Sequence, residues 1–216
     1  MTRNCCGDSS LDRTGQPGST FDPDVNPPRI IRTRRLILRA ITASDARAVY
    51  GAYASDSKAT RFLAWRAHKS LAETRHFLRQ ASRTWRQGTE HLWAVVLKRG
   101  GLIGSAGIRP CGPRIEIGYV LGQAWWGRGY ATEAARAIRA WAMKQPRVYR
   151  VWATCDVENK ASARVLRKIG MRREGILRKW IVRPALGLEP RDSLCYSIVK
   201  ERKPGRSGRR RGVSRP

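Results

Sequence analysis

The chain has 216 residues, 41% of them hydrophobic, which is enough for one domain with a substantial core and short additional segments. Forty-four Lys and Arg residues against sixteen Asp and Glu residues give a formal charge of +28, which implies attraction to anions such as nucleic acids or a polyphosphate cofactor. Five scattered cysteines without a Cys-x-x-Cys pair argue against a metal site, and no signal-peptide core or membrane-length apolar run is present, so we expect a cytoplasmic protein that does not enter membranes.

The first segments form a leader and the start of a domain. Residues 1–28 mix Gly, Ser, Asp, Asn and Pro with few large apolar side chains, so we expect a disordered leader. Residues 35–41 alternate apolar and polar side chains, which predicts a first strand, and Thr42 or Ser44 can cap a helix that follows it.

A second helix and a strand meander come next. The helix is predicted over residues 70–87, because Ser70 and Glu73 have capping-box spacing and Gly88 ends the apolar stripe. Glycine- and proline-rich turns then separate three short apolar runs, which should form an antiparallel meander. These strands are predicted over residues 91–98, 102–109 and 114–121.

The next unit is a strand, a helix and a strand. Apolar side chains share one face of a predicted helix over residues 132–144, and Pro146 prevents a longer one. A strand follows over residues 149–155. Because a helical crossover joins it to the strand at 114–121, these two strands should be parallel.

A short helix and two strands close the domain. The helix is predicted to end at Ile169, and the strands cover residues 172–179 and 194–201, on either side of a Pro- and Gly-rich excursion at 183–190. Residues 202–216 are basic without apolar periodicity, so we expect a disordered tail there.

The loop before the predicted helix at 132–144 has the composition of an anion site. It reads Trp126-Gly127-Arg128-Gly129-Tyr130-Ala131-Thr132. Small residues let its backbone approach a ligand, and free N–H groups at a helix start can point at phosphate oxygens. Thr132 stands where the dinucleotide fingerprint needs a third glycine, and no Gly-Lys-Ser/Thr ending marks a nucleoside-triphosphate loop. A tight turn that uses glycine for geometry alone is the alternative interpretation.

The loop resembles the acyl-CoA pyrophosphate loop of the GNAT N-acetyltransferases, Gln/Arg-x-x-Gly-x-Gly/Ala. Trp126 replaces the Gln or Arg, a variation that is similar to the RimJ/RimL branch. A second signature of that branch, Asn-x-x-Ser-x-x-x-x-x-Lys-x-Gly-Phe-x-x-Glu-Gly, is matched at Asn159, Ser162, Lys168, Gly170, Glu174 and Gly175, with Met171 for Phe. Alone, this stretch could be a capped amphipathic helix with a glycine stop. The order and separation of the two signatures favour the family.

The resemblance covers about residues 33–200 and implies a GNAT domain over 29–201. The implied fold class is α/β (α+β), a mixed and mostly antiparallel sheet that splays at its centre and is flanked by helices. The predicted element order agrees with it. The resemblance implies that the sheet opens after Leu121, where the strands at 114–121 and 149–155 part, and that acetyl-CoA, the acyl donor, lies in the opening.

The resemblance also implies roles for particular residues. Val120 and Leu121 would offer backbone groups to the pantetheine arm, and a backbone N–H near Val120 would stabilise the oxyanion. Asn159 would hold the arm beside Ser162, the candidate acid for the leaving thiolate. The pyrophosphate would be held by Trp126, Gly127, Arg128, Gly129, Tyr130, Ala131 and Thr132.

An amine must lose a proton before it attacks, and Glu116 is the candidate base, directly or through water. A solvent-facing strand carboxylate is the alternative for this residue. Tyr119 and Tyr130 are weaker candidates, because tyrosines at such positions often serve packing. The segment 56–69, with its aromatic residues and His68, would form one wall of the acceptor site or else only cover the core.

Two functions from different classes follow. The first is an acetyl-CoA-dependent N-acetyltransferase that acts on a primary amine, either a protein N-terminus, as on a ribosomal protein, or a small amine. The second is a nucleic-acid- or ribosome-binding module with a degenerate acyl-CoA pocket, suggested by the +28 charge and the tail around Arg206 to Arg210. The intact Asn159 and Ser162 favour catalysis, and we expect a monomer or homodimer.

Overall fold

The structure is a computed structural model that describes residues 25–201. The expected tail at 202–216 and residues 1–24 of the expected leader lie outside the described residues. Residues 25–28, which the sequence assigned to the leader, pack onto the domain. Val25 is buried in the main core, and the indole Nε1 of Trp93 donates to the carbonyl oxygen of Pro28 at 3.0 Å. The folded domain therefore includes Val25, upstream of the predicted boundary at residue 29.

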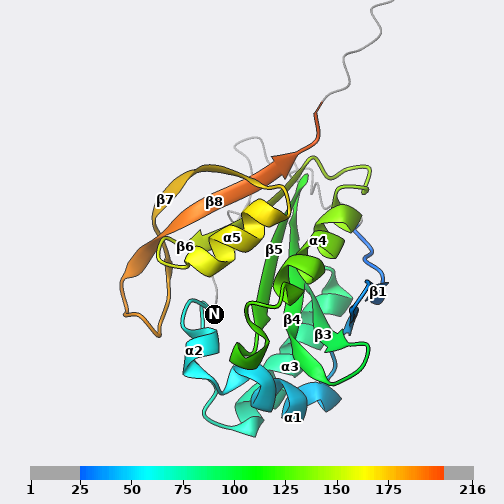
Figure 1. Ribbon diagram of the computed structural model, residues 1–216, viewed down its shortest axis with the longest axis vertical. Coiled ribbons are helices and arrows are strands. Elements are labelled where there is room, and N and C mark those ends of the chain that lie inside the picture. Colours follow the sequence, from blue (N-terminus) through cyan, green and yellow to red (C-terminus); the bar gives the residue numbers. More distant parts are fainter. Residues whose placement is uncertain (1–24, 202–216) are drawn as a thin grey trace, which may run out of the picture.

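One eight-stranded sheet carries helices on both faces (Figure 1). The strands are β1 (Ile30–Arg32), β2 (Leu36–Ala40), β3 (His91–Leu97), β4 (Leu102–Cys111), β5 (Arg114–Leu121), β6 (Arg150–Asp156), β7 (Arg172–Val182) and β8 (Pro190–Val199). The helices are α1 (Ala46–Val49), α2 (Ser57–Thr60), α3 (Leu71–Gln87), α4 (Tyr130–Ala142) and α5 (Lys160–Lys168), with short irregular turns at Ala43–Asp45, Tyr50–Ala54 and Gln123–Trp125.

The strands lie in the order β1-β2-β3-β4-β5-β6-β8-β7, and the pairs are antiparallel except for β5 with β6. This parallel pairing is short and ends at Glu116, which lies opposite Trp152. Beyond that point β5 stays with β4 and β6 stays with β8 along their full lengths, so the two halves of the sheet separate. The predicted splay is confirmed, but it begins after Glu116 rather than after Leu121.

The two faces of the sheet carry separate cores. On one face α4 and α5 pack over the alternate β5 residues Ile115 and Ile117, together with Leu38 and Trp93. On the other face α1 and α3 pack over Ala94 and Val120. In Figure 1 α4 and α5 lie on the near face and α3, drawn fainter, lies behind the sheet. The opening between β5 and β6 therefore has a different helical layer on each side.

Local signals explain most of the observed elements. Ser70 caps α3 by accepting the N–H of Glu73 at 3.2 Å, and Gly88 ends the helix with a φ of 75°. The helix predicted after Thr42 is divided into a short turn, α1 and a wider turn that ends at Ala54. β1 is too short to show alternation and was not predicted. Among residues 25–201, no helix is both long and apolar enough to cross a bilayer.

Candidate active site

The N-terminus of α5 is joined to β5 across the opening of the sheet. Asn159 caps α5, because its Oδ1 accepts the N–H of Ser162 at 3.0 Å. The Oγ of Ser162 lies 2.9 Å from the hydroxyl of Tyr119, and that hydroxyl also donates to the carbonyl oxygen of Ser162 at 3.3 Å. The predicted pair Asn159 and Ser162 therefore lies together, with Tyr119 as a partner from the facing strand.

The groups around Ser162 keep their protons at neutral pH. Burial raises the pKa of Tyr119 above its ordinary value, although the hydrogen bond with Ser162 acts in the opposite direction. Burial also raises the pKa of the free thiol of Cys155, on β6, to about 11, while a hydrogen bond from Ser162 acts to lower it. The cluster can therefore donate protons but is a poor base.

The loop before α4 has the backbone that its glycines predict. Gly127 and Gly129 adopt φ values of 76° and 77°, in the left-handed region that favours glycine. A Cβ added to Gly127 would meet no atom within 4 Å, so the space beside the loop is open. The first N–H groups of α4, from Tyr130 onward, have no acceptor within the helix. Open space, free donors and the exposed Arg128 together fit a pyrophosphate.

Trp126, which stands where the loop pattern has Gln or Arg, makes a specific hydrogen bond. Its indole Nε1 donates to the carbonyl oxygen of Leu121 at 2.8 Å, so the side chain folds the loop back onto the end of β5. The Leu121 carbonyl is thereby occupied. Trp126 remains half exposed and shapes the loop by this hydrogen bond without adding a charge.

An ion pair that the sequence did not predict holds the loop before α4 in place. Arg35, immediately before β2, donates from its Nε to Glu133 Oε2 at 2.7 Å and from Nη1 to the Arg128 carbonyl at 3.1 Å. Its guanidinium also lies 4.4 Å from the ring centre of Tyr130. Partial burial acts to raise the pKa of Glu133, but hydrogen bonds from Thr33 and Arg35 outweigh it and lower that pKa. Arg35 and Glu133 are 98 residues apart in the sequence, so no local pattern predicts their contact.

The strand register corrects the expectation for Val120. Gly122 donates its N–H to Ile103 of β4 at 2.9 Å, and hydrogen-bonded pairs alternate along an antiparallel ladder. The backbone groups of Val120 therefore point at its partner Ser105, inside the sheet. The residues whose backbone faces the open edge are Tyr119 and Leu121, one position to either side.

Glu116 lies where the opening begins, on the face of the sheet opposite Tyr119. Its carboxylate is partly buried and accepts a hydrogen bond from Arg109 of β4 at 3.2 Å, while Arg109 also pairs with Glu90. Burial raises the pKa of Glu116, and the charge of Arg109 opposes that increase. Glu116 is therefore not the freely solvated strand carboxylate of the alternative interpretation, and it stands apart from Ser162.

A buried ionic network fixes the end of β6 beside α5. The Asp156 carboxylate has no exposed surface and pairs with Arg183 at 3.0 Å and with Arg191 at 2.8 Å. Arg183 also donates to Ser193 and to the carbonyl oxygen of Phe62, between α2 and α3. The network thus joins the expected acceptor wall to the segment that carries Asn159. The sequence did not predict this network, because its Asp and Arg residues lie far apart and form no local pattern.

The expected acceptor wall contains an aromatic cluster. The rings of Trp65 and His68 stack at 4.8 Å, and Phe77 of α3 lies beside both. The Nδ1 of His68 lies 2.8 Å from the Thr74 hydroxyl. Burial lowers the pKa of His68, so the ring is part of a packed neutral cluster rather than an exposed polar group. The cluster covers the α1 and α3 core.

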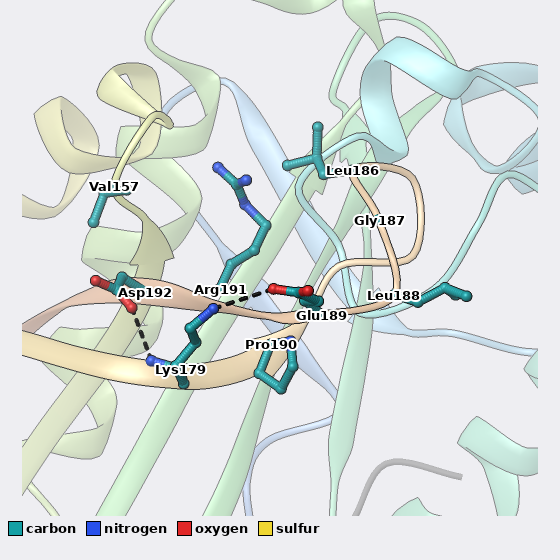
Figure 2. Close-up of a pocket in the computed structure, with 9 residues that line it drawn as sticks. All are labelled: Val157, Lys179, Leu186, Gly187, Leu188, Glu189, Pro190, Arg191 and Asp192. Carbon is teal, nitrogen blue, oxygen red and sulfur yellow. Dashed lines mark hydrogen bonds and ion pairs between the residues drawn. The ribbon is translucent and has the colours of Figure 1, made fainter.

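A hollow of about 580 Å³ lies at the turn of the β7–β8 hairpin (Figure 2). Lys179 lies between Asp192 and Glu189 in this view, and Leu186 and Leu188 stand on the loop beyond. The lining contains none of the predicted site residues. Within residues 25–201 no group of three His, Cys, Asp or Glu side chains is arranged to hold a metal.

Comparisons with known proteins identify the family to which this fold belongs. The profile described as "Acetyltransferase (GNAT) domain" matches residues 35–172, and this chain belongs to the GNAT acetyltransferase family. The resemblance inferred from the two signatures is confirmed.

Three relatives illustrate the relationship. The uncharacterized N-acetyltransferase YnaD of Bacillus subtilis is 33% identical over 173 residues, covering 79% of this chain and 97% of YnaD. A GNAT-family acetyltransferase structure from Bacillus anthracis is 32% identical with a TM-score of 0.68, covering 79% of this chain and 98% of that one. RimL, described as a ribosomal L7/L12 alpha-N-protein acetyltransferase in complex with coenzyme A, shares the fold at 20% identity and a TM-score of 0.68, covering 79% and 97%.

Proposed function

We propose that this protein transfers an acetyl group from acetyl-CoA to the α-amine of a protein N-terminus. The observation that carries the proposal is the meeting of three elements at one opening. These are the open edge of β5, the loop at Gly127 to Thr132, and the capped start of α5 with Ser162. Together they would provide phosphate donors, an unpaired strand edge and a proton donor.

The residues that would hold the cofactor follow from this arrangement. The N–H groups at Gly129 to Thr132 and the Arg128 guanidinium would bind the pyrophosphate, with Arg35 and Glu133 keeping the loop in place. The carbonyl of Tyr119 and the N–H of Leu121, on the open backbone edge of β5, would face the amides of the pantetheine arm, because Trp126 already occupies the Leu121 carbonyl. Acetyl-CoA itself supplies a thioester whose carbonyl carbon accepts the amine. No metal is needed for this chemistry.

Proton removal is assigned to Glu116. A primary amine is an ammonium ion in water and cannot attack until it loses a proton. Burial raises the pKa of Glu116, which makes its carboxylate a stronger base than an exposed glutamate, and the charge of Arg109 opposes that increase. Glu116 lies on the face of α1 and α3, so the amine would approach from that side.

Two donors act on the other side of the reaction centre. The N–H of Tyr119, on the open edge of β5, is the candidate donor to the acyl oxygen as that oxygen gains negative charge. Tyr119 is the residue next to Val120, near which the sequence predicted this donor. The Ser162 hydroxyl would give a proton to the departing sulfur, and Tyr119 can return one through their hydrogen bond.

The acceptor class is supported by similarity and by charge. RimL, which shares this fold, is described as acting on the α-amine of a ribosomal protein. The strongly basic chain would attract an acidic or ribosome-bound substrate and increase the encounter rate. A small amine is the second candidate, and the Glu116 carboxylate where the opening begins would attract one.

The test is a labelling experiment with the purified chain. Labelled acetyl-CoA is incubated with N-terminal peptides, polyamines and aminoglycosides, and each product is separated and counted. Labelling of peptides with a free α-amine, and not of the same peptides with a blocked N-terminus, supports the proposal. Labelling of polyamines or aminoglycosides alone would replace the protein acceptor with a small amine.

A further inference from the structure

The cofactor face does not account for all of the basic surface. Helix α3 exposes Arg75, Arg79, Arg83 and Arg86, spaced by four, four and three residues, so they form one stripe along the helix. Helix α3, which carries this α3 arginine stripe, lies on the α1 side of the sheet, whereas α4 and α5 lie on the other (Figure 1). Acyl-CoA binding therefore does not require it.

The stripe has no counter-charge in the part of the chain that the structure describes. None of its four guanidinium groups makes a hydrogen bond or ion pair with residues 25–201. The only carboxylate of α3, Glu73, accepts the backbone N–H of Lys69 at 2.9 Å. Like charges four residues apart repel and destabilise a helix, so the stripe opposes folding stability. A solvent-exposed helix without a binding role would usually mix both signs of charge.

We propose that the α3 arginine stripe binds the phosphodiester backbone of a nucleic acid. Its length, eleven residues at a rise of about 1.5 Å each, is about 16 Å, over which a duplex presents about ten phosphate charges. Each guanidinium can therefore face a phosphate. Arginine is well suited to phosphate because its planar fork donates two parallel hydrogen bonds.

The chemistry of α3 disfavours other partners. Protein interfaces have an apolar centre, and none of the exposed large hydrophobic residues of the described chain lies on α3. A helix that lies in a membrane surface presents an apolar face to lipid, but the apolar face of α3, with Leu78 and Ala81, is buried in the domain core. A purely cationic, evenly spaced stripe fits a polymer of evenly spaced anions.

The test compares two triple variants of the full chain that lose the same charge. The first is Arg75→Gln, Arg79→Gln and Arg83→Gln on α3, and the second is Arg172→Gln, Arg173→Gln and Arg178→Gln on the exposed edge strand β7. Binding of a fluorescent RNA duplex, of the DNA duplex of the same sequence and of polyglutamate is measured by anisotropy from about 50 to about 200 mM salt. The CoA-induced rise in melting temperature is measured for both variants.

For the α3 variant, the slope of log K against log salt should become less steep by about 2 to 3, since each lost phosphate contact contributes about 0.9. The β7 variant should change it by less than about 1. Binding of both duplexes identifies the shared backbone, and binding of RNA alone points to its 2′-hydroxyl groups. The proposal would be overturned if both variants lost the same affinity for the duplexes, or if the α3 variant lost none. It would also be overturned if polyglutamate bound as tightly as the duplexes.

Stability and cofactor binding give an independent readout. Glutamine keeps the helix propensity of arginine and removes the repulsion, so the α3 variant should melt at the same or a higher temperature than wild type. Its response to CoA should be unchanged. A lower melting temperature would show that the arginines stabilise the fold, which contradicts the argument for the stripe.

Discussion

The hydroxyl of Tyr119 and the Oγ of Ser162 lie 2.9 Å apart, across the gap between β5 and the start of α5. This contact links the strand that borders the opening to the helix that carries the candidate acid. Either oxygen can be the donor, so the proton that a leaving group needs is shared by two hydroxyls.

The first prediction separates these two hydroxyls. Ser162→Ala should lower kcat about 100-fold or more, with the Kd for acetyl-CoA changed less than about twofold, because the interaction matters mainly in the transition state. Tyr119→Phe should lower kcat less, since Ser162 remains. Both are measured at saturating acceptor. An equal or larger loss in Tyr119→Phe would assign the donor to Tyr119, and turnover of Ser162→Ala within about twofold of wild type would remove Ser162 from the mechanism.

The second prediction concerns the pyrophosphate loop and has a matched control. Gly129 and Gly88 have nearly the same backbone, with φ values of 77° and 75°, but Gly88 ends α3 on the other face of the sheet. Replacing either with Ala should cost about 1 to 2 kcal/mol of unfolding free energy, from the left-handed backbone. Only Gly129→Ala should reduce the CoA-induced rise in melting temperature. Equal CoA responses in the two variants would contradict the loop assignment.

The third prediction is a pH dependence. Burial raises the pKa of Glu116 above that of an ordinary glutamate. As the pH decreases and the carboxylate takes up a proton, kcat/KM should therefore fall, and it should do so at a higher pH than for an ordinary glutamate. Arg109→Gln removes the opposing charge and should move this acid limb to higher pH, whereas Arg99→Gln, in the exposed β3–β4 turn, should not. Glu116→Gln should lower the rate about 100-fold or more. A rate profile that is unchanged in Glu116→Gln would exclude this residue as the base.

The fourth prediction tests the buried network at the end of β6. Asp156→Asn leaves the buried Arg183 without its charge partner and should reduce the unfolding free energy by about 3 to 5 kcal/mol. Glu189→Gln, in the exposed pair with Lys179, should change it by less than about 1 kcal/mol. Denaturant unfolding measures both. Similar small losses in both variants would show that the network does not hold the domain together.

The same network predicts how stability depends on pH. Burial acts to raise the pKa of Asp156, but hydrogen bonds from the Arg191 side chain and from the backbone N–H of Glu158 outweigh it. The pKa of Asp156 in the folded protein therefore lies below the ordinary 3.8. The stabilisation is complete above about 3.8 and is lost as the pH falls through the lowered value. Wild type should therefore lose stability below that pH, and Asp156→Asn should lose less over the same interval.

The sequence predicted features that depend on local patterns. The strand limits of β5 were predicted to the residue, and Ser70 and Gly88 bound α3 as their types suggest. The second signature places Asn159 three residues before Ser162, and the two lie together at the start of α5. In each case the physical cause lies within a few residues of chain.

Other features depend on register and on distant partners. Whether Val120 or Tyr119 faces the opening is decided by the pairing of β4 with β5, and the start of the splay depends on how far β6 follows β5. Arg35 meets Glu133 only because β2 and α4 are packed together. Glu174, part of the second signature, pairs with Arg150 and Ser197 and so links three strands. None of these contacts has a local signal in the sequence.

The most direct measurement of the central claim is the mass of a reaction product. A peptide with a free N-terminus and no lysine is incubated with acetyl-CoA and the wild-type chain, beside the same peptide with its N-terminus blocked. We predict one added acetyl group on the free peptide, none on the blocked peptide, and none on either with the Glu116→Gln variant over the same time. A chain that binds CoA but acetylates no amine in such a panel would contradict the assignment of this site as an N-terminal acetyltransferase.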